Sequence, residues 1–201
     1  GIDISFLALR MSSDYKTARF NVLQGAAENL PFKDRSFDVV TSISSIEHFV
    51  SLLGILDEMQ RVLKPSGKLI LNCPSYDCFL LIPPSLEQLN PALKLLFRIR
   101  QFLKYLIVLF SNKYYFEIVN KPAVFSIGYK PDNDLVCIIT TAELLNYLKY
   151  RNFKILYVRQ RSLDADENKN SPKDLLKKIK LIHWLTRYWN IGLMIVAQKV
   201  D

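Results

Sequence analysis

Two apolar runs separated by an amphipathic stretch dominate the middle of the chain. Phe37–Ile43 and Lys68–Leu71 are rich in valine, isoleucine and leucine, and proline, glycine, serine or charged residues bound them. Such runs are typical of strands buried on both faces of a parallel sheet. Between them, apolar residues recur at helical spacing over residues 46–63, and Pro65 and Gly67 end the pattern. The stretch therefore predicts a βαβ unit with a right-handed crossover.

Shorter patterns on both sides extend the predicted sheet. Before the unit, Ile2–Ile4 predicts the end of a strand, Ser5–Lys16 a helix and Phe20–Leu23 a second strand. After it, Thr141–Tyr150 predicts a helix with leucines on one side, and Phe153–Val158 predicts a strand. Strands that alternate with helices in this way indicate an α/β fold.

The carboxyl-terminal part of the chain adds three further segments. Asp164–Lys173 is polar and without periodicity, which predicts a loop. Asp174–Trp189 predicts a basic helix, and Ile191–Gln198 predicts the last strand. His183 lies within the helix and is more typical of a packed or surface histidine than of a ligand.

Residues 76–134 depart from this alternation. They contain a predicted helix from about Pro91 to Phe110. At about 100° per residue, one side of this helix is polar and basic and the other is apolar. The polar side carries Lys94, Arg98, Arg100, Gln101 and Lys104, and the apolar side carries Leu95, Leu96, Ile99, Phe102, Leu103, Leu106, Leu109 and Phe110.

Two arrangements fit such a helix. A basic amphipathic helix can lie on an anionic membrane. Alternatively, it docks its apolar side on the sheet as a cap, which is the more frequent arrangement and the one we expect. In either case the segment should cover the carboxyl edge of the sheet, where substrate enters. Nearby aromatic residues either wall an apolar substrate pocket or fill the core of the cap. They are Tyr114, Tyr115, Phe116, Phe125 and Tyr129.

The composition limits the kinds of binding partner and the cellular compartment that we expect. The formal net charge of +8 permits nucleic acid, anionic lipid or an acidic substrate as a partner. The three cysteines, Cys73, Cys78 and Cys137, are sparse and not spaced as metal ligands, which indicates a reducing compartment. No uncharged apolar run reaches the roughly 18 residues of a membrane span. We therefore expect a cytoplasmic protein, soluble or peripheral to a membrane.

Polar side chains follow two of the predicted strands, where doubly wound sheets bind ligands. Asp3 comes at the end of the first strand; an acid there accepts two hydrogen bonds from a ribose diol, or caps the helix that follows. Glu47 and His48 come shortly after Phe37–Ile43. A glutamate in a first helical turn also fits the helix dipole alone. Histidine changes its charge near neutral pH, so His48 is a candidate base.

Taken in order, these stretches resemble the class I S-adenosylmethionine-dependent methyltransferases, specifically their small-molecule branch, the type 11 family. The motifs occur in the family's order and spacing. They are Gly25-Ala26-Ala27-Glu28-Asn29-Leu30-Pro31-Phe32, Ser36-Phe37-Asp38-Val39-Val40, Glu47-His48 and Glu58…Arg61-Val62-Leu63-Lys64-Pro65-Ser66-Gly67-Lys68-Leu69. The resemblance resumes over Ile139–Phe153, where Asn152 takes the place of the family's usual glycine.

The resemblance implies S-adenosylmethionine as the methyl donor. Asp3 would bind the ribose hydroxyls of this cofactor, and Ile4 would pack on the adenine face. Ala27 would offer its backbone N–H to the adenine ring. Ser42 and Ile43 would line the methionine end. Glu47 and His48 would face the substrate, with His48 as the base if the acceptor must lose a proton.

The sequence departs from the family's pattern in three ways. Ala26, at a cofactor-binding position, stands where the family commonly has an aspartate that holds the adenine amino group. The family's G-x-G-x-G loop and the central first strand would precede Gly1, so we expect an amino-terminally truncated chain. Some relatives that bind a metal have a glutamate where this chain has Ser44, so no metal is predicted.

The expected fold is therefore α/β, a Rossmann-like methyltransferase sheet that is mostly parallel, has its last strand antiparallel and lacks its first strand. That loss should leave a gap or force abnormal pairing between the strands that end at Asp3 and Ile43. Residues 1–75 and 135–201 would form the core, incomplete at its amino terminus. Residues 76–134 would form a helical, aromatic cap insertion.

The expected function is methyl transfer to a small, apolar or lipid-like acceptor by in-line displacement, with the 201 residues inactive on their own. The alternative is a non-catalytic methyltransferase-like module that binds a membrane surface or a protein partner, which Ala26 and the missing loop favour. Nucleic-acid methylation is disfavoured, because no Asn-Pro-Pro-Tyr or Asp-Pro-Pro-Tyr tetrapeptide follows Phe37–Ile43. The sequence gives no indication of the oligomeric state.

Overall fold

The predicted βαβ unit is present in the computed structural model. Strand β3 (Phe37–Ile43) pairs in parallel with β4 (Leu63–Pro74), and helix α2 (Leu52–Val62) connects them after a short 3-10 turn, η2 (Ile46–His48). The structure describes residues 1–12, 21–77, 82–83, 86, 89–119, 135–162 and 190–200.

Strand β4 is longer than the sequence predicted, because it begins directly after α2. The pairing register jumps from Leu63 opposite Phe37 to Lys68 opposite Val39, so the residues between bulge out of the ladder. Gly67 lies in this bulge, and a Cβ there would be only 2.8 Å from the Lys64 carbonyl oxygen. The proline and glycine that predicted the helix end therefore shape a bulge inside the strand.

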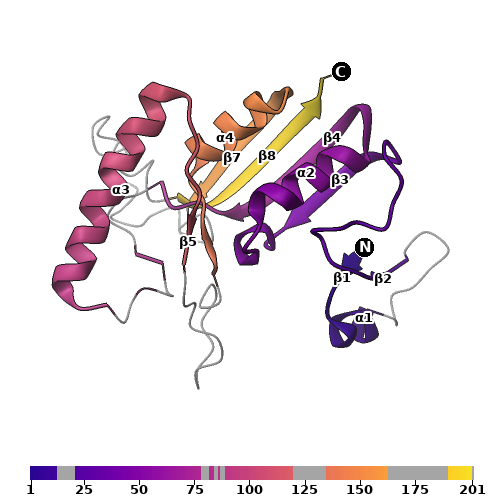
Figure 1. The fold of residues 1–201 in the computed structure, drawn as a ribbon, viewed down its shortest axis with the longest axis horizontal. Coiled ribbons are helices and arrows are strands. Elements are labelled where there is room, and N and C mark those ends of the chain that lie inside the picture. The colour runs from indigo at the N-terminus through magenta and orange to yellow at the C-terminus, as the bar shows by residue number, and fades with distance from the viewer. Residues whose placement is uncertain are drawn as a thin grey trace, which may run out of the picture.

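Four strands form the main sheet, in the order β3-β4-β8-β7 (Figure 1). Strand β8 (Asn190–Lys199) lies between β4 and β7 (Phe153–Ser162) and is antiparallel to both. The predicted antiparallel last strand is thus confirmed. Asn152, which replaces the family's glycine before β7, has a φ of 58°, a left-handed conformation that asparagine tolerates better than most residues.

Helices α2 and α4 (Thr141–Tyr150) pack on one face of this sheet and form the core. The buried face of β4 carries Leu69 and Leu71, and that of β8 carries Ile195. The helices contribute further leucine, isoleucine and methionine side chains. They are Leu52, Ile55, Leu56 and Met59 from α2 and Leu144 and Leu148 from α4.

Strand β3 differs from the expectation of burial on both faces. Val39 and Ile43 are 47% and 67% exposed, and among the described residues only β4 pairs with β3. Strands β1 (Ile2–Asp3) and β2 (Leu23–Gln24) form a separate parallel ladder beside helix α1 (Phe6–Met11), set apart from the main sheet in Figure 1. Among the described residues, the strands that end at Asp3 and Ile43 thus belong to separate ladders.

The longest described helix is α3 (Pro91–Ser111), whose bounds the sequence predicted to within one residue. Asn90 caps it by accepting a hydrogen bond from the Leu93 N–H. The short strands β5 (Glu117–Ile118) and β6 (Cys137–Ile138) pair beside it in an antiparallel ladder. No helix among the described residues is long and apolar enough to cross a bilayer.

The expected docking of α3 is wrong, because the helix turns its polar side inward. Gln101 is 6% exposed, whereas Leu96 and Leu103 are 61% and 53% exposed. The carboxylates of the half-buried Glu117 and the fully buried Glu143 face the helix and attract its amide and ammonium groups. These pairings determine which side of α3 faces the rest of the chain.

Several predictions lie outside the described residues. They are the loop Asp164–Lys173, the helix Asp174–Trp189 with His183, the second half of the helix Ser5–Lys16, Phe20, Cys78, Phe125 and Tyr129. The division into a core and a 76–134 cap stays a prediction.

A polar network holds the loop before β3 on helix α2. The Arg61 guanidinium donates to the carbonyl oxygens of Leu30 and Phe32 at 2.9 and 2.8 Å and to the Glu58 carboxylate at 2.7 Å. Glu58 in turn accepts from the Leu30 N–H at 2.8 Å. These bonds hold the pKa of Glu58 below its ordinary value, chiefly through Arg61.

We expect acid to loosen this loop. Because the folded-state pKa of Glu58 is lowered, its contribution to the free energy of unfolding is present above the unfolded pKa of roughly 4.3 and is lost as pH falls through the folded pKa. Urea unfolding at a series of pH values from 7 to 3 measures the free energy of unfolding. This free energy should decrease more steeply with falling pH for the wild type than for Glu58→Gln. Glu28→Gln, which changes an exposed glutamate, is the matched control. Parallel pH profiles of wild type and Glu58→Gln would contradict the expectation.

Candidate active site

The carboxyl end of β3 is a tight, serine-rich turn. Ser42 is 5% exposed, and its Oγ lies 2.5 Å from the Ser45 Oγ. Ser44 has a φ of 48°, unusual for a residue with a side chain, and its N–H donates to the Asn72 carbonyl oxygen at 2.7 Å. Strain of this kind concentrates at functional sites. Ile43 points away from the core and is 67% exposed.

Glu47 and His48 follow this turn in η2. The Glu47 side chain is buried, and its Oε1 lies 3.6 Å from the His48 Nε2, while 29% of the His48 side chain is exposed. The Val136 N–H donates to the Glu47 carbonyl oxygen at 3.0 Å and anchors η2 to the segment before β6. A buried carboxylate beside a partly exposed imidazole can orient that ring and stabilise its protonated form.

A second group of predicted residues lies on the β1–β2 ladder. Asp3, exposed at the carboxyl end of β1, accepts a hydrogen bond from the Ser5 N–H at 2.8 Å. Ser5 is the cap of α1, since its Oγ accepts from the Ala8 N–H at 3.2 Å. Asp3 is therefore not needed as the helix cap, which was the alternative explanation for an acid at this position. Ile4 is 70% exposed.

Ala26 and Ala27 lie directly after β2. The Gly25 N–H donates to the Asp3 carbonyl oxygen at 3.1 Å, which brings this segment beside the end of β1. The Ala26 carbonyl oxygen accepts from the Asn29 N–H at 3.3 Å in a turn, and Ala27 packs against the main core. The structure thus gathers the predicted residues into two groups, one at the end of β1 and one at the end of β3.

A buried cluster that the sequence analysis missed lies at the carboxyl end of β4. The Asp77 carboxylate accepts from the Thr141 N–H at 2.7 Å, from the Thr141 hydroxyl at 2.6 Å and from the Gln160 amide at 2.5 Å. Ser75 Oγ lies 3.1 Å from Thr141 Oγ1. The cluster therefore joins β4, α4 and β7. An acid three residues after a strand was its only signal in the sequence.

Burial shifts the acid–base behaviour of two groups near this edge. It raises the pKa of the Asp77 carboxyl, and hydrogen bonds from Thr141 oppose the rise. It also raises the pKa of the Cys73 thiol, with the nearby Glu47 carboxylate adding to the effect. Cys73 therefore stays a neutral thiol and is a poor nucleophile.

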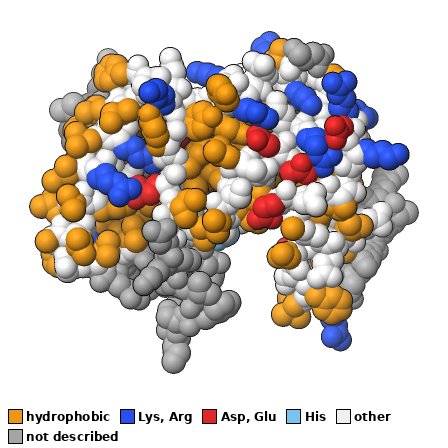
Figure 2. All heavy atoms as spheres, in the orientation of Figure 1, with side chains coloured by type: hydrophobic (Ala, Val, Ile, Leu, Met, Phe, Trp, Pro, Cys, Tyr) orange, Lys and Arg blue, Asp and Glu red, His pale blue; other side chains and the backbone are white. Residues whose placement is uncertain are grey.

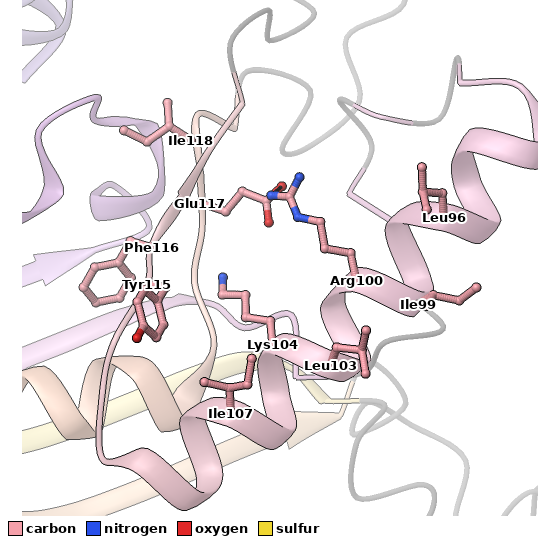
Figure 3. A pocket seen from close by; sticks show the side chains of 10 residues that line it. All are labelled: Leu96, Ile99, Arg100, Leu103, Lys104, Ile107, Tyr115, Phe116, Glu117 and Ile118. Carbon is pink, nitrogen blue, oxygen red and sulfur yellow. Dashed lines mark ion pairs between the residues drawn. The ribbon is translucent and has the colours of Figure 1, made fainter.

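A hollow of about 790 Å³ lies between α3 and residues 115–118. Figure 3 shows Arg100 and Lys104 pointing from α3 toward this segment, whereas Leu96, Ile99 and Leu103 point away from it. Arg100 forms an ion pair with Glu117 at 2.5 Å. Of the predicted aromatic residues, Tyr115 and Phe116 line the hollow, and Tyr114 and Phe116 pack on Tyr147 of α4.

Comparison with known sequences matches the first third of the chain to one family. Residues 1–71 match the family described as "Methyltransferase domain". The demethylmenaquinone methyltransferase of Staphylococcus haemolyticus is 40% identical over 73 residues, which are 35% of this chain and 30% of that protein. The aligned part thus spans less than a third of the length of this curated relative.

Solved structures share the fold over nearly the whole chain. A S-adenosylmethionine-dependent methyltransferase from Methanosarcina mazei is 21% identical, with a TM-score of 0.55 over 100% of this chain and 81% of that one. The cyclase SpnF is 15% identical, with a TM-score of 0.56 over 100% of this chain and 66% of that one. At these identities the likeness shows the fold, and the cyclase shows that the fold serves more than one reaction.

Proposed function

We propose, from the premise that this chain belongs to the S-adenosylmethionine-dependent methyltransferases, that the natural protein methylates a small, apolar or lipid-like acceptor. One observation carries the proposal. Asp3 presents an exposed carboxylate at the carboxyl end of β1, although the following helix is already capped by Ser5. The carboxylate accepts one local hydrogen bond, from the Ser5 N–H, so an exposed acid at a ligand-binding edge still has acceptor capacity for a ligand.

The residues present fit one part of S-adenosylmethionine. The Asp3 carboxylate would accept hydrogen bonds from the ribose hydroxyls, and the exposed Ile4 side chain offers apolar surface to the adenine ring. Ser42 and Ile43 would lie at the methionine end. Ala26 supplies no side-chain acceptor for the adenine amino group. When bound, this cofactor supplies a methyl group on a positively charged sulfur.

His48 is the residue we propose to take a proton from the acceptor. Its imidazole is partly exposed, and the Glu47 carboxylate 3.6 Å away would hold the ring in place. Glu47, which is almost completely buried, would position the ring rather than contact the substrate. In-line methyl transfer depends mainly on the placement of donor and acceptor, so the rigid turn at Ser44 would help by fixing this edge.

Two observations support an apolar acceptor. The hollow beside α3 is walled mostly by leucine, isoleucine and tyrosine side chains. The relative from Staphylococcus haemolyticus is named for demethylmenaquinone, which is an apolar quinone compound. Both are compatible with a lipid-like acceptor that approaches from the α3 side of the molecule.

Calorimetric titration of the full natural protein with S-adenosylmethionine tests the proposal. Asp3→Ala should weaken binding roughly ten- to hundredfold, because hydrogen bonds to a charged group are lost. Asp38→Asn is the matched control, since Asp38 is an exposed aspartate at the opposite, amino end of β3. Equal affinity of wild type and Asp3→Ala would remove Asp3 from the site. No binding by the wild type would overturn the proposal.

The second candidate function is a non-catalytic module of the same family that binds a membrane surface or a protein partner. Ala26 favours it, because the side chain cannot hold the adenine amino group. Absence of cofactor binding in the titration above, together with a normal fold by circular dichroism, would favour this candidate.

A further inference from the structure

Helix α3 presents a long apolar surface to the outside. Eight of its large apolar side chains are 41–82% exposed, among them Leu95, Leu96, Ile99, Leu103, Ile107 and Phe110. At 1.5 Å per residue the helix is about 30 Å long. Figure 2 shows hydrophobic side chains gathered over this helix, with basic side chains among them. Apolar patches of this extent mark interaction surfaces.

Specific polar contacts hold the helix in this orientation. Lys104, whose side chain is 13% exposed, forms an ion pair with the fully buried Glu143 at 3.0 Å. The Gln101 amide donates to the Glu117 carboxylate at 2.7 Å. Turning the apolar side inward would break both contacts and remove the ammonium group that balances the charge of the buried Glu143 carboxylate. The apolar face is therefore kept outward by the fold.

The charges of α3 indicate what this face meets. Residues 91–111 contain four basic residues and no acidic residue. Arg98 and Arg100 are two positions apart, about 200° around the axis, so they lie on opposite flanks of the apolar face. The Arg100 side chain is 63% exposed. An apolar face with cationic flanks is complementary to a bilayer with anionic headgroups.

We propose that α3 lies flat on an anionic phospholipid membrane. Its apolar face enters the boundary between headgroups and acyl chains, and the excess of basic over acidic residues in the helix attracts it to the anionic headgroups. A second copy of the chain is a poorer occupant, because it would bring two basic helices together. The proposal concerns binding alone and does not depend on methyl transfer.

Flotation with lipid vesicles tests the proposal. The protein should float with vesicles of phosphatidylcholine and phosphatidylglycerol and should remain in solution with phosphatidylcholine alone. Replacing both Leu96 and Leu103 by glutamine should weaken binding at least about tenfold, because apolar contact is lost. Arg98→Gln and Arg100→Gln should each weaken it roughly fivefold and reduce its dependence on salt. Leu53→Gln, at a leucine of α2 that is 42% exposed, is the matched control.

The depth to which α3 enters the bilayer can be measured independently of flotation. Phe110 is 82% exposed, so Phe110→Trp places a fluorophore on the apolar face with little effect on folding. Lipids with brominated acyl chains should quench its fluorescence more strongly than that of Leu53→Trp. Equal quenching, or equal flotation of wild type and the Leu96/Leu103 double variant, would overturn the proposal. Self-association that the double variant abolishes, without vesicle binding, would assign the face to a second copy and also overturn it.

Discussion

Replacing Lys104 with methionine should lower the free energy of unfolding by roughly 3–5 kcal/mol, one of the largest effects expected for a single residue of α3. The reason is the Glu143 carboxylate, which is fully buried and has its pKa raised by burial, with the Lys104 charge opposing the rise. Without the ammonium group, this charge stays in the interior unless the carboxyl takes up a proton. Urea unfolding at pH 7 measures the loss.

The pH dependence of that loss distinguishes the ion pair from packing. Because the folded-state pKa of Glu143 is raised, a protonated carboxyl is favoured in the fold, and stability is lost as pH rises through that pKa. The deficit of Lys104→Met should therefore shrink toward acid pH. The double variant Lys104→Met/Glu143→Gln should recover much of the loss. Leu103→Gln, on the exposed side, should stay within about 0.5 kcal/mol of the wild type. The reverse ranking would mean that the apolar side faces inward.

Replacing His48 with alanine should slow methyl transfer by the natural protein about 100-fold or more, if the acceptor loses its proton to this ring. Affinity for S-adenosylmethionine should not change, because His48 belongs to the acceptor side of the proposed site. The measurement is transfer of a labelled methyl group to a lipid extract, with cofactor affinity determined separately by titration.

The pH profile separates a base from a structural role. Only a neutral imidazole can accept a proton, so the rate of methyl transfer by the wild type should decrease at acid pH. The rate of His48→Ala should not show this decrease. Glu47→Gln keeps the shape of the buried side chain but removes the charge 3.6 Å from the ring, so transfer should slow by less than in His48→Ala. An unchanged rate and profile for His48→Ala would exclude it as the base.

The sequence predicted most of the sheet, because the patterns that indicate its strands and helices lie within short stretches of the chain. Thr140 caps α4, accepting from the Glu143 N–H at 3.3 Å, and the glutamate three residues later reaches back to its hydroxyl at 2.7 Å. Such a capping pair can be read directly from the chain, and the bounds of α4 were predicted correctly. The bounds of α3 were predicted to within one residue, and the structure adds that Asn90 caps the helix and Pro91 begins it.

The remaining features depend on contacts between distant parts of the chain. Periodicity showed that α3 has two unlike sides, but the buried glutamates that draw its polar side inward lie elsewhere in the sequence. Asp77 meets Thr141 and Gln160 only once β4, α4 and β7 are assembled. In the candidate site, the sequence showed that Glu47 and His48 follow β3. It could not show that the Glu47 side chain is buried and that the His48 side chain is partly exposed.

The position of β8 has a consequence for synthesis on the ribosome. Leu69 pairs with Ala197 and Leu71 with Ile195, so the centre of the sheet is filled by residues that are translated after both of its neighbours, β4 and β7. Until they emerge, β4 and β7 have no common neighbour, and their inward leucines and cysteine stay accessible. Such a nascent chain depends on chaperones for longer than one whose strands pair in order of synthesis. Truncation before Asn190 would leave the protein permanently in that state.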